Sequence, residues 1–213
     1  GEVVQAILIG ASRGVGRQSI SFLDASSAAN VLQKADSLQR GEITSITPGA
    51  IRRDPDLRFL PTQDSSFPLL AEYADYSKGI CTGDDPQYSR AFWEVGLLSN
   101  APGWFPIQGA VKTSDTFGGL ESVLLWEAGE GRLHRYVSER LGGSTGAWIR
   151  GQSVWGKRGV LVRSMGDLPV SLYLGSAFEQ SVAAVVPRKA EHLSAVYAFM
   201  VSDEYRNAVR AIN

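Results

Sequence analysis

The chain has 213 residues, of which 44% are hydrophobic and 20% are charged, and its formal net charge at neutral pH is −1. This composition is typical of one globular domain or two small ones, and the single cysteine, Cys81, excludes a disulfide framework. No run of 18 apolar residues is present, so we expect no membrane span and predict a cytoplasmic protein. The net charge argues against a non-specific coat on DNA but leaves room for a local basic surface.

The first part of the chain reads as a support or linker segment over residues 1–75. Residues 2–9 are apolar and end at Gly10, which favours a buried strand. Residues 29–40 have apolar side chains at helical spacing and end at Gly41, a typical helix stop. Residues 42–67 are rich in Pro, Asp, Ser and Thr, which predicts a long surface excursion.

The second part, residues 76–213, contains most of the regular structure that the sequence predicts. Asp85 looks like an N-cap for a short helix over residues 86–92, followed by an extended segment over 93–97. Apolar runs predict strands over residues 122–126, 154–165, 170–174 and 181–186, and helical spacing predicts helices over 133–141, 191–201 and 203–212. We therefore expect an α/β (α+β) fold with a largely antiparallel central sheet and with flanking and C-terminal helices.

A glycine motif near the N-terminus is typical of short-chain dehydrogenases. Gly10, Gly14 and Gly16 have the spacing at which a backbone approaches the pyrophosphate of NAD(P). Such an enzyme also needs a Tyr four residues before a Lys, and no lysine of this chain has one. We favour a turn after a buried strand, and an NAD(P)-dependent oxidoreductase remains the alternative.

Other catalytic patterns are weak. Gly142, Ser144 and Gly146 match G-x-S-x-G, with Asp167 and His192 following in the order of a hydrolase triad, but helix precedes the serine where a strand is needed. Two histidines and one cysteine offer no metal cluster. No carboxylate lies two residues before a lysine, as metal-dependent nucleases usually require, and no two prolines are adjacent, as amino-group DNA methylation requires. We expect neither DNA cleavage nor DNA methylation from this chain alone.

The segment of residues 78–95, KGICTGDDPQYSRAFWEV, combines a glycine turn, charges and aromatic residues. It resembles the target-recognition region of adenine-specific DNA methyltransferases and fused restriction-modification enzymes, where a K-G-x-x-T-G-D turn precedes an F/W-W-E-V element. Further matches follow in order at residues 124–131, 155–160, 175–187 and 192–205. The resemblance covers about two-thirds of the chain.

The resemblance implies the α/β fold of one half of a type I restriction specificity subunit. It further implies a domain that binds double-stranded DNA sequence-specifically for the methyltransferase core of the same bacterial polypeptide, with residues 1–75 including the tail of that core. S-adenosylmethionine is expected in the parent enzyme, whereas this chain lacks the cofactor-binding and catalytic parts. A protein-interaction module without a DNA role is a further alternative.

Seven residues are candidates for DNA contact under this interpretation. Thr82 and Asp84 have the chemistry to read base edges, and the cations have the chemistry to bind phosphates or guanine. The candidates are Lys78, Thr82, Asp84, Arg90, Lys157, Arg158 and Arg163. Each has a structural alternative: Asp84 can cap a turn, and Arg90 can pair with Glu94. We expect Phe92, Trp93 and Val95 to anchor the segment in the core.

Overall fold

The computed structural model describes residues 19–25, 28–52, 68–97 and 100–210. The chain divides into two compact units, Gly1–Phe67 and Pro68–Asn213. The division comes before the boundary expected after residue 75, because Ala74 is already buried in the second unit and pairs with Pro187. The strand predicted over residues 2–9 and the glycines Gly10, Gly14 and Gly16 lie outside the described residues.

In the first unit, the described residues form a two-stranded antiparallel sheet and two helices. The strands are β1 (Ile20–Phe22) and β2 (Thr44–Ile46), with Ile20 paired to Ile46, and the helices are α1 (Val31–Arg40) and α2 (Pro48–Ile51). Helix α1 begins because the Asn30 side chain accepts a hydrogen bond from the Gln33 N–H at 2.9 Å, and it ends at Gly41 as predicted. The long surface excursion expected over residues 42–67 contains β2 and α2, in which Ile46 and Ile51 are buried, and its residues 53–67 lie outside the described residues.

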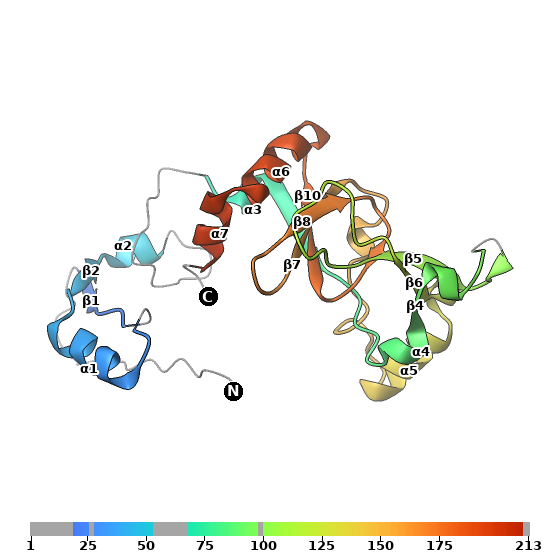
Figure 1. Ribbon diagram of the computed structural model, residues 1–213, viewed down its shortest axis with the longest axis horizontal. Coiled ribbons are helices and arrows are strands. Elements are labelled where there is room, and N and C mark those ends of the chain that lie inside the picture. The colour runs from blue at the N-terminus through green and yellow to red at the C-terminus, as the bar shows by residue number, and fades with distance from the viewer. Residues whose placement is uncertain (1–18, 26–27, 53–67, 98–99, 211–213) are drawn as a thin grey trace. The chain divides into compact units, whose positions relative to one another are not determined.

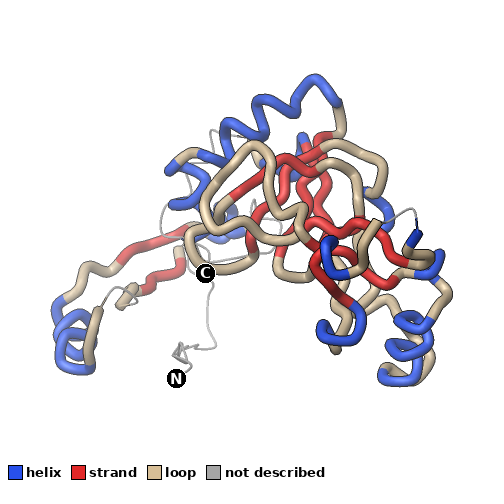
Figure 2. The backbone as a smooth tube through the Cα atoms, turned by 45° about the vertical axis from the view of Figure 1, so that its right-hand side comes forward, coloured by secondary structure: helices blue, strands red, loops and turns tan. Residues whose placement is uncertain are grey.

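The second unit contains two four-stranded sheets (Figures 1 and 2). The first sheet has the order β3 (Ala74–Lys78), β10 (Val182–Pro187), β7 (Gly159–Arg163) and β8 (Val170–Tyr173), and every pairing is antiparallel. The second sheet has the order β4 (Ser89–Ala91), β6 (Ser122–Leu125), β5 (Trp104–Gln108) and β9 (Ala177–Phe178), and only β5 and β9 are parallel.

The helices of the second unit cover these sheets and complete its cores. Helix α6 (Leu193–Val201) packs Val196 and Met200 against the valines of the first sheet, and α7 (Asp203–Arg210) follows it, while the short α3 (Leu70–Tyr73) leads into β3. Helix α5 (Arg132–Arg140) packs Leu133 and Val137 against the second sheet, near the short α4 (Asp85–Tyr88). The four-residue spacing of each buried pair explains why these helices bury one face.

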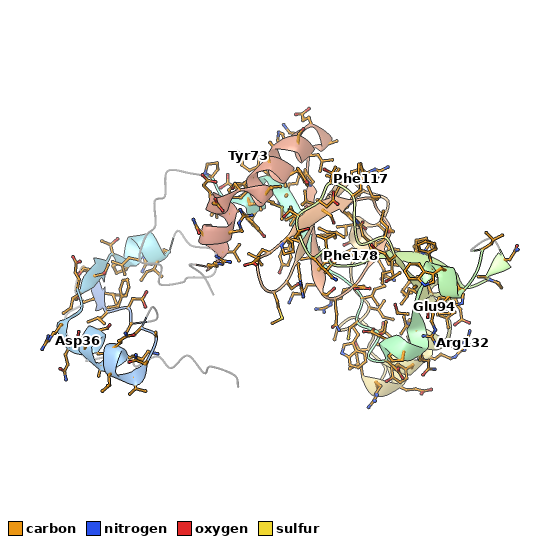
Figure 3. The ribbon with its side chains drawn as sticks, in the orientation of Figure 1. Asp36, Tyr73, Glu94, Phe117, Arg132 and Phe178 are labelled. Atoms are coloured by element: carbon orange, nitrogen blue, oxygen red, sulfur yellow. The ribbon has the colours of Figure 1, made fainter. Side chains whose placement is uncertain are left out.

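Phe178 joins the two sheets (Figure 3). It belongs to β9 of the second sheet, yet its fully buried ring packs edge to face on Tyr173 of the first sheet, with 5.3 Å between ring centroids. Gln108 adds a polar link, because its buried amide donates to the carbonyl oxygens of Gly118 and Leu172 and accepts from the Leu174 N–H. The sheets therefore share a continuous interior.

The predicted mixed α/β fold with largely antiparallel strands is confirmed, although the described strands of the second unit form two sheets where one central sheet was expected. Three local predictions are wrong: the helix over 86–92 ends at Tyr88, the extended segment over 93–97 is replaced by a 3₁₀ turn, η1 (Phe92–Glu94), and the strand over 154–165 begins only at Gly159. Strand β5 was not predicted. Among the described residues no helix is long and apolar enough to cross a membrane.

Candidate nucleic-acid interface

The glycines of the K-G-x-x-T-G-D turn serve close packing. A Cβ atom on Gly79 would collide with the backbone of Phe178 and Glu179, and one on Gly83 would collide with the Trp148 ring. Gly83 also has a φ of +71°, a left-handed conformation that favours glycine. The Cys81 N–H donates to the Trp148 carbonyl oxygen at 2.9 Å. The turn is therefore held between β9 and the segment around Trp148.

Thr82 and Asp84 stabilise this turn by hydrogen bonds from their side chains. Thr82 is only 4% exposed, and its hydroxyl group donates to the Asp85 carboxylate and accepts from the Asp84 N–H at 3.2 Å. Asp84 is the N-cap of α4, because its carboxylate accepts from the Gln87 N–H. The expectation that Thr82 is free to meet DNA is wrong, and for Asp84 the structural alternative holds. The cap is Asp84 and not Asp85.

Arg90 and Glu94 close the free edge of β4, which is the outer strand of the second sheet. The Arg90 guanidinium donates to the carbonyl oxygens of Pro86 and Ser89, and the Glu94 carboxylate accepts from the Ala91 N–H at 2.7 Å. Edge strands tend to pair with other chains unless their polar groups are covered. The two side chains thus satisfy the strand edge separately and do not pair with each other.

The expectation that Phe92 and Trp93 anchor the segment in the core is wrong. Their side chains are 47% and 63% exposed, and the rings contact each other edge to face with 5.0 Å between centroids. They follow β4, the outer strand of the second sheet. Val95 is partly buried. Residues 84–130, which we call the acidic segment, contain seven Asp or Glu and two Lys or Arg.

The remaining four candidates are exposed and have no hydrogen bond or ion pair from their side chains to any described residue: Lys78, Lys157, Arg158 and Arg163. Lys78 and Arg163 lie at one end of the first sheet, since Lys78 pairs with Ala183 and Arg163 with Val182. Their partners Ala183 and Val182 are successive residues of β10, and successive side chains of a strand point to opposite faces, so Lys78 and Arg163 lie on opposite faces of the sheet. Lys157 and Arg158 precede β7 and lie at its other end, roughly 13 Å or more from Arg163 at about 3.3 Å per residue. The four cations therefore do not form one cluster.

Sequence reasoning missed a larger charge asymmetry that the fold makes visible. Residues 131–166, which we call the basic segment, contain seven Lys or Arg and one Asp or Glu, a net charge of +6. The cations are Arg132, Arg135, Arg140, Arg150, Lys157, Arg158 and Arg163. A running charge count along the sequence would have found it.

Helix α5 presents part of this charge on its outer face. Leu133 and Val137 are fully buried, so the exposed Arg132, Arg135 and Arg140 lie away from the core. Arg132 is held by Glu127 at 3.2 Å, and the Arg140 Nε donates to the Tyr136 hydroxyl group at 3.3 Å. Arg135 has no such side-chain partner among the described residues. Figure 3 shows Arg132 at the surface of this end of the unit.

An aromatic triad connects α5 to the turn that contains Lys157 and Arg158. The Trp155 ring stacks on Phe105, with 5.9 Å between centroids and 20° between planes, and meets Trp126 edge to face at 5.2 Å. Trp126 directly precedes the 3₁₀ turn η3 (Glu127–Gly129), whose Glu127 holds Arg132. Trp126 is buried and Phe105 is 39% exposed. The triad thus fixes two cationic elements on one scaffold.

The described residues do not support the other catalytic patterns. Ser144 lies in an exposed turn after α5, so the strand that a hydrolase elbow requires is missing before it, and the Asp167 carboxylate accepts instead from Arg210 at 2.9 Å. Within the described part of the chain, no three His, Cys, Asp or Glu side chains form a potential metal site. The glycines of the oxidoreductase alternative lie outside the described residues.

Glu179 is a partly buried carboxyl group with a raised pKa. It lines a small cavity of about 90 Å³ together with Asp85, Thr82 and Ser181. Burial raises the pKa of the Glu179 carboxyl group, the Ser181 hydroxyl group opposes this, and the nearby Asp85 carboxylate adds to it. The cavity is too small for a substrate of ordinary size, since ligand pockets typically have volumes of about 300–1,000 Å³.

No protein-family model matches this chain, and a search of curated proteins finds no relative. The assignment of a function therefore depends on the residues of the chain and on the geometry described above.

Proposed function

We propose that residues 68–213 form a sequence-specific recognition domain for double-stranded DNA and that the basic segment is the surface that contacts it. The observation that carries the proposal is the net charge of +6 over residues 131–166 in a chain whose total is −1. Phosphate neutralisation supplies much of the affinity of such proteins for DNA. A local basic surface provides this attraction even though the net charge of the whole chain is not positive.

The state of the individual cations supports this assignment. Arg135, Lys157, Arg158 and Arg163 are exposed and have no ion pair with a described residue. When an exposed cation without an intramolecular partner binds a ligand, no interaction within the fold has to be broken. Lys157 and Arg158 are too far from Arg163 to hold one phosphate, but the phosphates of one DNA strand recur about every 3.4 Å along the helix axis, so one duplex offers a partner to each.

The resemblance to target-recognition domains gives the proposal its biological setting. In that setting the chain is a non-catalytic part of a bacterial adenine-N6 DNA methyltransferase or restriction-modification polypeptide, in the cytoplasm, and the core of that polypeptide uses S-adenosylmethionine. The glycine turn at residues 78–84 then has a structural role, because Thr82 and Asp84 hold α4 in place. DNA contact shifts from this turn to residues 131–166.

The acidic segment suits the methyltransferase core better than DNA. Phe92 and Trp93 expose an aromatic pair beside Glu94 and Glu121, whose carboxylates repel phosphates. An exposed apolar patch is a common feature of protein interfaces. We place the core of the same polypeptide on this surface, opposite in charge to the DNA surface.

The test is selection of duplexes from a random pool by the whole 213-residue chain. The proposal expects enrichment of one short consensus site, and the enriched duplex should bind at least tenfold more tightly than a shuffled one. Binding without enrichment would reduce the domain to a non-specific cationic surface. Saturable NAD(P) binding with no duplex binding would support the oxidoreductase alternative.

A further inference from the structure

A hollow of about 390 Å³ lies beside the last helix of the second unit. It is formed by the loop between β5 and β6, by the turn between β7 and β8, and by α7. Its lining residues are Lys112, Thr113, Ser114, Asp167, Pro169, Arg206 and Arg210. Three cations and two hydroxyl groups thus converge on one space, whereas a single carboxylate, that of Asp167, faces it.

The cations of the hollow differ in how firmly they are held. Arg206 donates to the Asp203 carboxylate at 2.6 and 3.3 Å and to the Val201 carbonyl oxygen at 2.9 Å, so its guanidinium is fixed. Arg210 has one ion pair, with Asp167 at 2.9 Å, and both side chains are more than half exposed. Lys112 is exposed and has no hydrogen bond or ion pair with a described residue.

The hydroxyl groups supply neutral donors. The Ser114 Oγ accepts from the Val170 N–H at 3.2 Å, which fixes the oxygen at the rim of β8 and leaves its proton for another acceptor. Thr113 precedes it in the same exposed loop. A set of ammonium, guanidinium and hydroxyl donors around one space is the complement of a tetrahedral anion with several acceptor oxygens.

We propose that this hollow binds a phosphate group. Lys112 supplies a mobile charge, Arg210 turns the free edge of its guanidinium to the anion, and Ser114 donates a hydrogen bond. The Arg210–Asp167 pair does not prevent binding, because exposed ion pairs contribute only about 0–1 kcal/mol and the fork of one arginine can hold two anions. The phosphate group belongs either to the backbone of DNA or to a small phosphate compound.

The experiment titrates inorganic phosphate into the whole chain at constant ionic strength, with chloride as the balancing anion, and follows heat release and the thermal midpoint. A ligand that binds the folded state raises the midpoint with concentration. We expect the midpoint to rise in the native chain and in the Lys112→Arg variant. Binding should be at least tenfold weaker in Lys112→Ala and in Arg210→Ala.

Arg188→Ala is the matched control, because Arg188 is a comparably exposed, ion-paired arginine that does not line the hollow. It should bind phosphate like the native chain. Equal phosphate binding by the native chain and both alanine variants, or no binding by the native chain, would overturn the proposal.

A second arm distinguishes the sources of the phosphate. A parallel loss of duplex affinity in Lys112→Ala supports a DNA phosphate in the hollow, and unchanged duplex affinity supports a small phosphate compound. The titration with inorganic phosphate does not depend on DNA binding, so the hollow and the proposed function can fail separately.

Discussion

The acidic and basic segments are neighbours in sequence and share one scaffold, yet several of their charged groups have different roles. In the acidic segment the carboxylates of Asp84 and Glu127 each accept a backbone N–H at the start of a helix, and that of Glu94 accepts one at a strand edge. In the basic segment Arg135 and Arg158 have no such task among the described residues. A charged side chain that already has a partner within the fold is weak evidence of an external ligand. An exposed charged side chain without such a partner is available to bind one. A net charge near zero conceals this difference.

The largest expected effect comes from reversing charge in the basic segment. Arg135→Glu combined with Arg158→Glu should weaken duplex binding by about two orders of magnitude or more, roughly 3 kcal/mol, because two attractive sites become repulsive. Fluorescence anisotropy with a labelled duplex measures it. The control is Lys34→Glu with Lys189→Glu, which changes the net charge equally at exposed positions outside the segment. An equal loss in the control would show that only total charge matters.

Thr82→Val tests whether the glycine turn is scaffold or reader. The variant keeps the shape of the buried side chain but removes its hydrogen bonds to Asp85 and Asp84, so the free energy of unfolding should fall by about 1–3 kcal/mol. Urea denaturation measures the loss. Duplex affinity of the folded variant should remain within about twofold of the native value. The opposite pattern, normal stability with lost affinity, would return Thr82 to the DNA interface.

Glu179→Gln tests the acid that faces the cavity beside Asp85. Burial raises the pKa of Glu179 in the folded chain above its ordinary value of 4.5, so folding favours the neutral form. The contribution of the neutral Glu179 side chain to the free energy of unfolding is complete below the pKa that this group has in the unfolded chain. It is lost as the pH rises through the higher pKa of the folded chain. The glutamine variant should therefore gain stability relative to the native chain as pH rises above 4.5. A stability difference independent of pH would contradict the assignment.

Among these variants, Trp93→Ser should have the smallest effect on stability and on duplex affinity. The side chain is 63% exposed, so the free energy of unfolding should change by no more than about 0.5 kcal/mol, and duplex affinity should not change. Binding to the partner that we propose for this surface, a methyltransferase core produced separately, should weaken, and surface plasmon resonance can follow binding to the duplex and to the core. Loss of duplex affinity with an intact fold would show that DNA binds the acidic segment, contrary to the assignment of DNA to the basic segment.

The sequence predicted what local patterns encode. Helix α5 was placed within one residue of each end, because Leu133 and Val137 lie one turn apart and Gly142 follows the helix. Strand β5 was missed because Pro106 interrupts it and proline is rare inside sheets. The strand tolerates this proline because β9 pairs only with Ile107 and Gln108. That tolerance depends on tertiary pairing, which local patterns do not contain.

The candidate site was less predictable for the same reason. A T-G-D turn suits base reading and helix capping equally well, and only the burial of Thr82 decides between them. Phe92 and Trp93 look like core residues until β4, the strand that they follow, proves to be an edge strand. The sequence placed Lys157 and Arg158 inside a strand, but β7 begins only at Gly159 and both side chains are exposed before it, so these two candidates keep their place in the proposed interface.

The central claim is that cations of the basic segment neutralise DNA phosphates. The most direct test measures the duplex dissociation constant of the native chain, Arg158→Ala and Arg188→Ala over a series of salt concentrations. Each lost phosphate contact reduces the slope of log affinity against log salt by about 0.9. We predict this reduction and weaker binding for Arg158→Ala, with native behaviour for Arg188→Ala, whose guanidinium is paired with Asp75. Identical slopes and affinities for Arg158→Ala and the native chain would contradict the claim.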